Sequence, residues 1–282
     1  MSTALVIDST TFLPKEVMDS YIIRSAPAII IWEGNELLDG IDIQPSEFFE
    51  RLAKSEEHPT TSQATPQMFK DIYQELLDMG HDIFAITISS KLSGFNASAN
   101  QAKADFPDAN IEVLDSLTGA GSVALVLDRV IAAAKGGASP QDLKAMAKAH
   151  CENTNLLIMP ETLEYLYRGG RIGGAARFLG TALKTLPILE IQEGAFEGVE
   201  RVRTHAKALD RLVEISAERV GGRKPVHVKV IHANAHEMAE KVLEKFKAAV
   251  DVASSGITDV SPGVGVHLGP GTVGISFLAG VE

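Results

Sequence analysis

The 282-residue sequence has little cysteine and no long apolar run. Cys151 is the one cysteine, so no disulfide can form within the chain, as is usual for proteins of a reducing compartment. No stretch approaches the roughly 18 apolar residues that a membrane span needs. The start, MSTALVIDST, has no basic segment ahead of an apolar one, unlike a signal peptide. We therefore expect a cytoplasmic protein.

The sequence also has fewer cationic than anionic side chains. The chain carries 26 Lys and Arg against 37 Asp and Glu, a formal net charge of −11. A surface of this sign repels polyphosphate chains and anionic lipid headgroups. We expect neither nucleic acid nor an anionic membrane as the main partner, and we interpret the acidic surface as a source of solubility.

Several motifs that mark enzymes and cofactor sites are absent. The sequence has no GxxxxGK[ST], no strand-embedded GxGxxG and no GxSxG. His232 and His236 lie four residues apart without an acidic partner in motif spacing, so we predict a surface pair and no metal site. The glycine-rich segment RGGRIGG, residues 168–174, does not directly follow a strand. We therefore interpret it as a turn where two backbones approach closely, in preference to a phosphate-binding loop. We predict no cofactor and no catalytic residue.

The first half of the chain alternates short apolar runs with amphipathic segments. The runs at residues 4–7, 28–31, 83–88 and 111–114 predict strands, and apolar spacings of three and four predict helices between them. Short links between such elements favour a parallel sheet with helices on both faces. We predict an α/β domain over residues 1–152.

The second half reads differently. Residues 188–192 and 198–203 flank the turn Glu193-Gly194 and predict a hairpin, which makes part of the sheet antiparallel. We also expect a helix over residues 178–186. The prediction is a mixed-sheet α+β domain over residues 153–282.

One stretch, Ile83 to Ala99, joins a buried strand to a helix through a Ser/Gly loop. Such a junction directs unpaired backbone N–H groups at one spot, where an anion binds well. Ser93 in this loop is either a helix cap or a ligand contact, and the stretch alone leaves both open. Other donors are scattered along the chain. Hydroxyls, an arginine and a histidine suit a carboxylate or phosphate, and the candidates are Thr61, Ser62, Ser93, Arg203 and His267.

Taken together, the motifs resemble the DegV family of bacterial fatty-acid-binding proteins. The matching segments run in family order and include VIDSTTFLP, TSQATPQMF, ISSKLSGFNASA, VLDS, ETLEYLYRGGRIGGAA, VRTHAKAL and HLGPGTVG. The chain departs from the commonest family pattern at Ala64-Thr65, Phe95-Asn96 and Leu268. In this family a tunnel holds the lipid. These positions lie where a substitution alters the shape of that tunnel and hence the acyl chain that the protein prefers.

The resemblance implies two α/β domains with a long-chain fatty acid between them. Thr61 and Ser93 would contact the carboxylate, with Ser62 and Gly94 in the same loops, and His267 would contact it from the HLGPG turn. Arg203 would sit near the head group and favour a phosphate. The resemblance also implies an ATP-binding fatty acid kinase subunit as partner, acyl phosphate as the carried product, and peripheral membrane contact for lipid exchange. Apolar candidates for the tunnel wall are Ile29, Ile31, Phe84, Ile86, Phe95, Phe178 and Leu179.

A second hypothesis makes the protein an enzyme in its own right. Ser93 would be the nucleophile of an acyl hydrolase or transferase, with His267 as its base. The sequence offers neither a nucleophile elbow nor an acid to orient the histidine. We therefore favour the binding protein.

Overall fold

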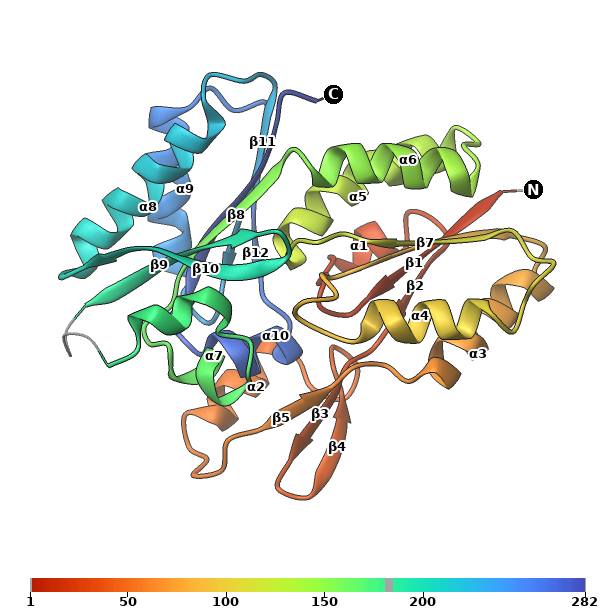
Figure 1. Cartoon of the computed structure of the whole chain (residues 1–282), viewed down its shortest axis with the longest axis horizontal. Helices are drawn as coiled ribbons and strands as arrows, with labels where there is room; N and C mark the ends of the chain where they lie inside the picture. The colour runs from red at the N-terminus through yellow and green to blue at the C-terminus, as the bar shows by residue number, and fades with distance from the viewer. Residues whose placement is uncertain (1, 181–184, 282) are drawn as a thin grey trace.

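The computed structural model describes residues 2–180 and 185–281 as two sheets with flanking helices and a third, smaller sheet (Figure 1). The strands are β1 (Thr3–Asp8), β2 (Ile23–Ala26), β3 (Ile29–Trp32), β4 (Asn35–Leu38), β5 (Thr60–Ser62), β6 (Asp82–Thr87), β7 (Ile111–Asp115), β8 (Thr154–Met159), β9 (Leu186–Gln192), β10 (Ala195–Val202), β11 (Val226–His232), β12 (Ser254–Asp259) and β13 (Val273–Ala279). The helices are α1 (Lys15–Met18), α2 (Pro45–Leu52), α3 (Pro66–Asp78), α4 (Phe95–Lys103), α5 (Ala120–Lys135), α6 (Pro140–Cys151), α7 (Glu164–Arg168), α8 (His205–Val220), α9 (His236–Ala249) and α10 (Pro262–Leu268), with a 3₁₀ helix, η1 (Gly173–Phe178). None of the helices in these ranges has both the length and the apolar character required to cross a membrane.

The first sheet is parallel and has the strand order β2-β1-β6-β7. Its strands are buried on both faces because successive side chains point to opposite sides. On β1, Ala4 and Val6 pack with α3 and α4, whereas Leu5 and Ile7 pack with α5 and α6. Figure 1 shows these two helix pairs on opposite faces of the sheet. The predicted parallel α/β architecture of the first half is confirmed.

The second sheet is mixed and has the order β10-β9-β8-β13-β11-β12. Strands β9 and β10 form the predicted hairpin. Among the described pairs of adjacent strands in this sheet, β11 and β12 alone are parallel and the others are antiparallel. Helices α8 and α9 cover one face through apolar side chains such as Leu212, Val242 and Phe246. The predicted mixed sheet of the second half is therefore confirmed.

The third sheet, in the order β4-β3-β5, connects the two halves. Ile30 and Trp32 of β3 are fully buried and belong to one hydrophobic cluster with Ile158, Leu189 and Ile231 of the second sheet. Residues 29–62 thus lie in sequence between β2 and β6 of the first sheet, yet the buried side chains of β3 pack against the second. The division at residues 152 and 153 coincides with the passage from α6 to β8, and we keep it as a proposal.

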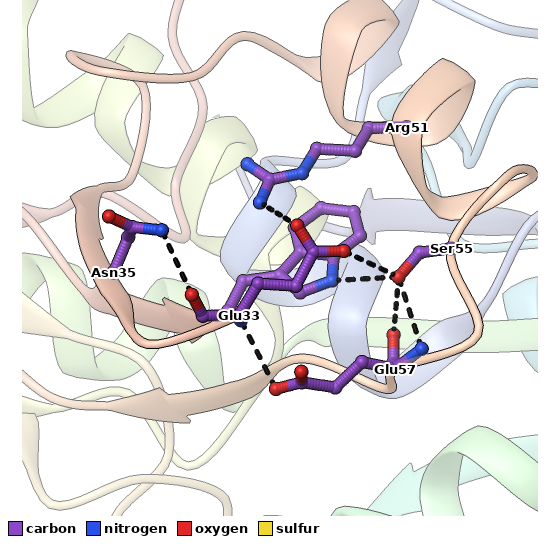
Figure 2. A network of polar contacts seen from close by, with 6 residues as sticks. Glu33, Asn35, Arg51, Ser55 and Glu57 are labelled. Atoms are coloured by element: carbon purple, nitrogen blue, oxygen red, sulfur yellow. Dashed lines mark hydrogen bonds and ion pairs between the residues drawn. The ribbon is translucent and has the colours of Figure 1, made fainter.

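A polar network braces the chain on its way into β5 (Figure 2). The Ser55 hydroxyl donates to Glu33 Oε1 at 3.0 Å and accepts from Trp32 Nε1 at 3.2 Å. Arg51 forms an ion pair with Glu33 at 2.8 Å and stacks 4.2 Å from the Trp32 ring centroid. The bond from Arg51 holds the pKa of Glu33 below its usual range. This network fixes the end of α2 and the loop that leads into β5.

Three details differ from the sequence predictions. The run at residues 28–31 forms β3 of the small sheet, and β2, which was not predicted, takes the place beside β1. Strand β5 and helix α10 were also missed. The helix predicted over 178–186 is wrong where it can be examined: residues 179 and 180 form a turn and Leu186 begins β9, while residues 181–184 lie outside the described chain.

Candidate functional site

An apolar cavity with one polar end lies between the two halves of the molecule. Its polar side chains are Thr10, Thr61, Ser62, Ser93, Arg171 and His267. The rest of the lining is apolar or glycine: Ala28, Ile88, Leu92, Phe95, Gly119, Ala120, Leu156, Ile158, Phe196, Ile231, Gly263, Val264 and Leu268. Both halves contribute to the wall, so the cavity exists only when they pack together.

The polar end is organised by a bond between two predicted site residues. Thr61 Oγ1 lies 2.7 Å from His267 Nε2, although 206 positions separate them in sequence. Thr61 is held in place because β5 pairs with β3, where it lies opposite the buried Ile30. His267 is presented by α10, whose N-cap Ser261 accepts from the Val264 amide at 3.3 Å.

A buried carboxylate fastens α10 to the first half. Asp39 accepts from Ser9 Oγ at 2.7 Å, from Ser261 Oγ at 2.9 Å and from the Gly263 amide at 3.0 Å. Burial raises the pKa of Asp39, whereas these three bonds act in the opposite direction. Removing one partner of such a buried group is costly. Asp39 therefore positions the helix that carries His267.

His267 is neutral at physiological pH. Burial lowers its pKa to about 4, with smaller contributions from the cationic Arg171 and from His58. A neutral imidazole carries one N–H, and Nδ1 of His267 has no hydrogen-bond partner among the described residues. If Nε2 carries the proton, it donates to Thr61, and the threonine O–H is then free to donate into the cavity.

Ser93 lies in the loop between β6 and α4. The amide of Ser93 bonds the Ser89 carbonyl at 3.1 Å, and the Ser89 hydroxyl bonds the Gly194 carbonyl of the β9–β10 turn at 2.7 Å. The N-cap position of α4 is Gly94, and no side chain caps this helix. The cap alternative for Ser93 therefore finds no support, and the Ser93 side chain lines the cavity instead.

Arg171 is the cation of the polar end and was missed at the sequence level. Its Nε donates to the Leu92 carbonyl at 2.9 Å and its Nη1 to the Gly169 carbonyl at 2.5 Å. These bonds tie the turn after α7 to the loop that carries Ser93. An arginine between two glycine pairs in RGGRIGG was the available signal, since a tight turn there fixes the guanidinium.

The other predicted residues fall into two groups. Ser62 lines the cavity beside Thr61, and Gly94 adjoins Ser93 at the start of α4. Arg203 is exposed just after β10 and is not among the cavity-lining residues. Of the seven apolar tunnel candidates, all in the described chain, Phe95 alone lines this cavity.

At the glycine-rich segment, residues 168–174, the backbone packs closely against another segment of the chain, as predicted. An added Cβ at Gly173 would lie 2.5 Å from the Phe196 carbonyl oxygen, so only glycine lets the turn after α7 pack against β10. At Gly169, an added Cβ would lie 2.8 Å from Cε1 of His267 and closer still to its Nδ1. The segment shapes the polar end of the cavity.

The contacts do not assemble a nucleophile–base pair. His267 Nε2 bonds Thr61, and within residues 2–180 and 185–281 no hydrogen bond joins it to Ser93. No carboxylate orients its Nδ1 in that part of the chain. Over the same ranges, no group of three or more His, Cys, Asp or Glu side chains is arranged to hold a metal ion.

Comparisons with known proteins by family model, by sequence and by structure all match one family, over nearly the whole chain. A family model described as an uncharacterised protein of the DegV family matches residues 2–280. A DegV domain-containing protein of Clostridium perfringens is 31% identical over 281 residues, 98% of this chain and 99% of the relative. The solved structure of a DegV family protein from Thermus thermophilus, described by its fatty acid binding, matches with a TM-score of 0.93 at 29% identity, covering 99% of this chain and 100% of that one. DegV of Bacillus subtilis, described as a fatty acid binding protein, matches with a TM-score of 0.85 at 31% identity and 99% coverage of each chain.

Proposed function

Because the chain belongs to the DegV family, we propose that it binds a long-chain fatty acid in the cavity between its two halves. The observation that carries this proposal is the Thr61–His267 bond at the polar end of an otherwise apolar cavity. The relatives from Thermus thermophilus and Bacillus subtilis, described as fatty-acid-binding proteins, support it.

In this proposal the carboxylate lies among Thr61, Ser93 and Arg171. The two hydroxyls donate to its oxygens, and Ser62 and Gly94 shape the same loops. His267 orients the Thr61 hydroxyl, and the guanidinium supplies the compensating charge. A carboxylate needs several such donors because an unpaired buried charge is costly. The free N–H groups at the start of α4 add a favourable dipole.

The tail and the head group have separate roles. Burial of an alkyl chain contributes about 0.8 kcal/mol per CH₂, so about 14 methylenes come to roughly 11 kcal/mol before the cost of association. A charge-assisted hydrogen bond contributes about 1.5–3 kcal/mol. The tail therefore sets most of the affinity, whereas the head-group donors set orientation and the preference for an acid.

We further propose that the protein is the non-catalytic, acyl-binding subunit of a fatty acid kinase. An ATP-binding partner subunit would phosphorylate the bound carboxylate, and this chain would carry the acyl phosphate in the cytoplasm. The chain itself would need no cofactor, and transient contact with a membrane surface would exchange the lipid. Arg203 keeps its proposed preference for the phosphate, but from the outside of the cavity, since its side chain is exposed.

Solvent extraction of the purified protein followed by mass spectrometry tests fatty acid binding directly. We expect a co-purified long-chain acid, displaced by added palmitate or oleate. Thr61→Val should weaken acid binding about tenfold by removing one donor and the partner of His267, while a fatty alcohol of equal length binds as before. Thr60→Val, on the exposed neighbour in β5, is the matched control. Absence of bound lipid together with no binding of either acid would refute the proposal.

Arg203→Ala tests the kinase role separately. Binding of free fatty acid should stay within about twofold of the parent, because the side chain does not line the cavity. Formation or retention of acyl phosphate with the partner subunit should fall about tenfold or more, since a doubly charged phosphate depends strongly on arginine donors. Equal losses in both assays would count against this assignment.

A further inference from the structure

A second, larger opening shares no lining residue with the first cavity. It is a cleft of about 910 Å³ at the carboxyl ends of the parallel strands β11 and β12. Both halves line it, through residues Phe12, Gln44, Pro45, Ser46, Phe49, Leu209, His232, Asn234, Ala235, His236, Glu237, Met238, Lys241, Asp259 and Gly271. The carboxyl ends of parallel strands are a common place for ligands in α/β proteins. None of the residues assigned to the fatty acid lines this cleft.

Two imidazoles converge at one edge of the cleft. His232 ends β11 and is 4% exposed, whereas His236 begins α9 with an exposed side chain. His232 Nε2 lies 3.2 Å from His236 Nδ1. When two nitrogens bind the same tetrahedral metal ion, each at about 2.05 Å, they are separated by about 3.3 Å. The observed separation therefore suits a shared metal ion.

The remaining nitrogen of each ring lies within 4 Å of a carboxylate oxygen. Asp259, the register partner of His232 on β12, places Oδ1 3.4 Å from His232 Nδ1. The same nitrogen accepts from the Ala235 amide at 3.5 Å, a long bond that is given up when Nδ1 carries the proton. Glu240 places Oε1 3.6 Å from His236 Nε2. Ligating histidines commonly hold their second N–H against a carboxylate, which fixes the ring and raises its basicity.

We propose that His232 and His236 together bind one divalent transition-metal ion at the edge of this cleft, with the carboxylates of Asp259 and Glu240 beside the second nitrogen of each ring. Imidazole nitrogens favour ions such as Zn²⁺ and Co²⁺ over Mg²⁺ or Ca²⁺. The described chain offers two ligands and no third, so the remaining positions would face the cleft and be filled by water or a small anionic ligand. This inference replaces the sequence prediction of an ordinary surface pair, and it is independent of fatty acid binding.

Calorimetric titration of the untagged chain with Zn²⁺ tests the site, and the visible absorption of bound Co²⁺ reports its coordination. We expect one ion per chain and an affinity at least about tenfold lower in His236→Ala. Because His236 is exposed, that variant should fold even if His232→Ala does not. Asp259→Asn should lower the affinity about tenfold without removing a ligand.

His205→Ala is the matched control. His205 also begins a helix, has an exposed side chain and lies 3.2 Å from a carboxylate, that of Glu161, but has no second imidazole beside it. Metal affinity in this variant should equal that of the parent chain. Equal affinities in the parent and His236→Ala would overturn the proposal, and so would the absence of saturable binding up to about 1 mM ion. Either result would leave a direct His–His hydrogen bond as the reason for the 3.2 Å contact.

Discussion

Arg171→Gln is expected to weaken binding of a long-chain fatty acid about 10–100-fold at neutral pH. The guanidinium lines the polar end of the cavity, and only two of its three nitrogens are engaged: Nε with Leu92 and Nη1 with Gly169. No hydrogen bond to Nη2 is found within the described chain, which leaves it available to a carboxylate. Hydrogen bonds to charged groups contribute about 1.5–3 kcal/mol, and each 1.4 kcal/mol is about a factor of ten.

Two comparisons make this prediction specific. A fatty alcohol of the same chain length should bind Arg171→Gln and the parent alike, because the lost interaction is with a charge. Arg168→Gln removes a cation from the same segment, but Arg168 is exposed and paired with Glu164 on the surface, so acid binding should be unchanged. Fluorescence competition with a labelled fatty acid measures all five affinities. A parallel loss for acid and alcohol would show that Arg171 holds the fold of the loop and does not meet the carboxylate.

The sequence predicted the first half of the fold well because its signals are local. A continuous apolar run such as residues 83–88 indicates a strand that is buried on both sides, and capped amphipathic segments indicate the helices between strands. The elements that were missed carry weak local signals. Strand β5 has three polar residues, and α10 contains two glycines and a proline. Long-range contacts hold both: β5 pairs with β3, and Ser261 and Gly263 of α10's first turn donate to Asp39.

The same reasoning explains the candidate site. Thr61, Ser93 and His267 were chosen for their side-chain chemistry and assigned to the carboxylate through family motifs, and the cavity brings these three together from segments up to 206 residues apart. The spacing of apolar residues along the sequence does not show which distant segments meet at one site. Arg171 and Arg203 show the limit most clearly, since both are arginines in family motifs. The glycine turn packed against β10 and the bond to the Leu92 carbonyl place Arg171 at the cavity, whereas Arg203 follows β10 with an exposed side chain.

Gly169→Ala should destabilise the protein and weaken acid binding together. Gly169 has φ −75° and ψ −7°, ordinary values for alanine, so the substitution adds a methyl group without backbone strain. That methyl would lie 2.8 Å from Cε1 of His267 and closer to Nδ1, well inside van der Waals contact. The ring must turn, and its bond to Thr61 must break. Overpacking costs about 1–3 kcal/mol, and loss of the bond should reduce acid affinity roughly tenfold.

A double-mutant cycle with His267→Ala separates this collision from any general effect of the substitution. Once the imidazole is removed, the methyl group has space, so Gly169→Ala should cost little further stability in that background. Gly256→Ala serves as the control, because no atom lies within 4 Å of its added Cβ, and its stability should match that of the parent or rise slightly. Denaturant unfolding gives each free energy. If the costs of Gly169→Ala and His267→Ala simply add, the glycine does not set the position of His267. A strongly subadditive result would place Gly169, Thr61 and His267 in a single unit, in which a glycine in the turn after α7 is needed for an imidazole on α10 to orient a hydroxyl on β5.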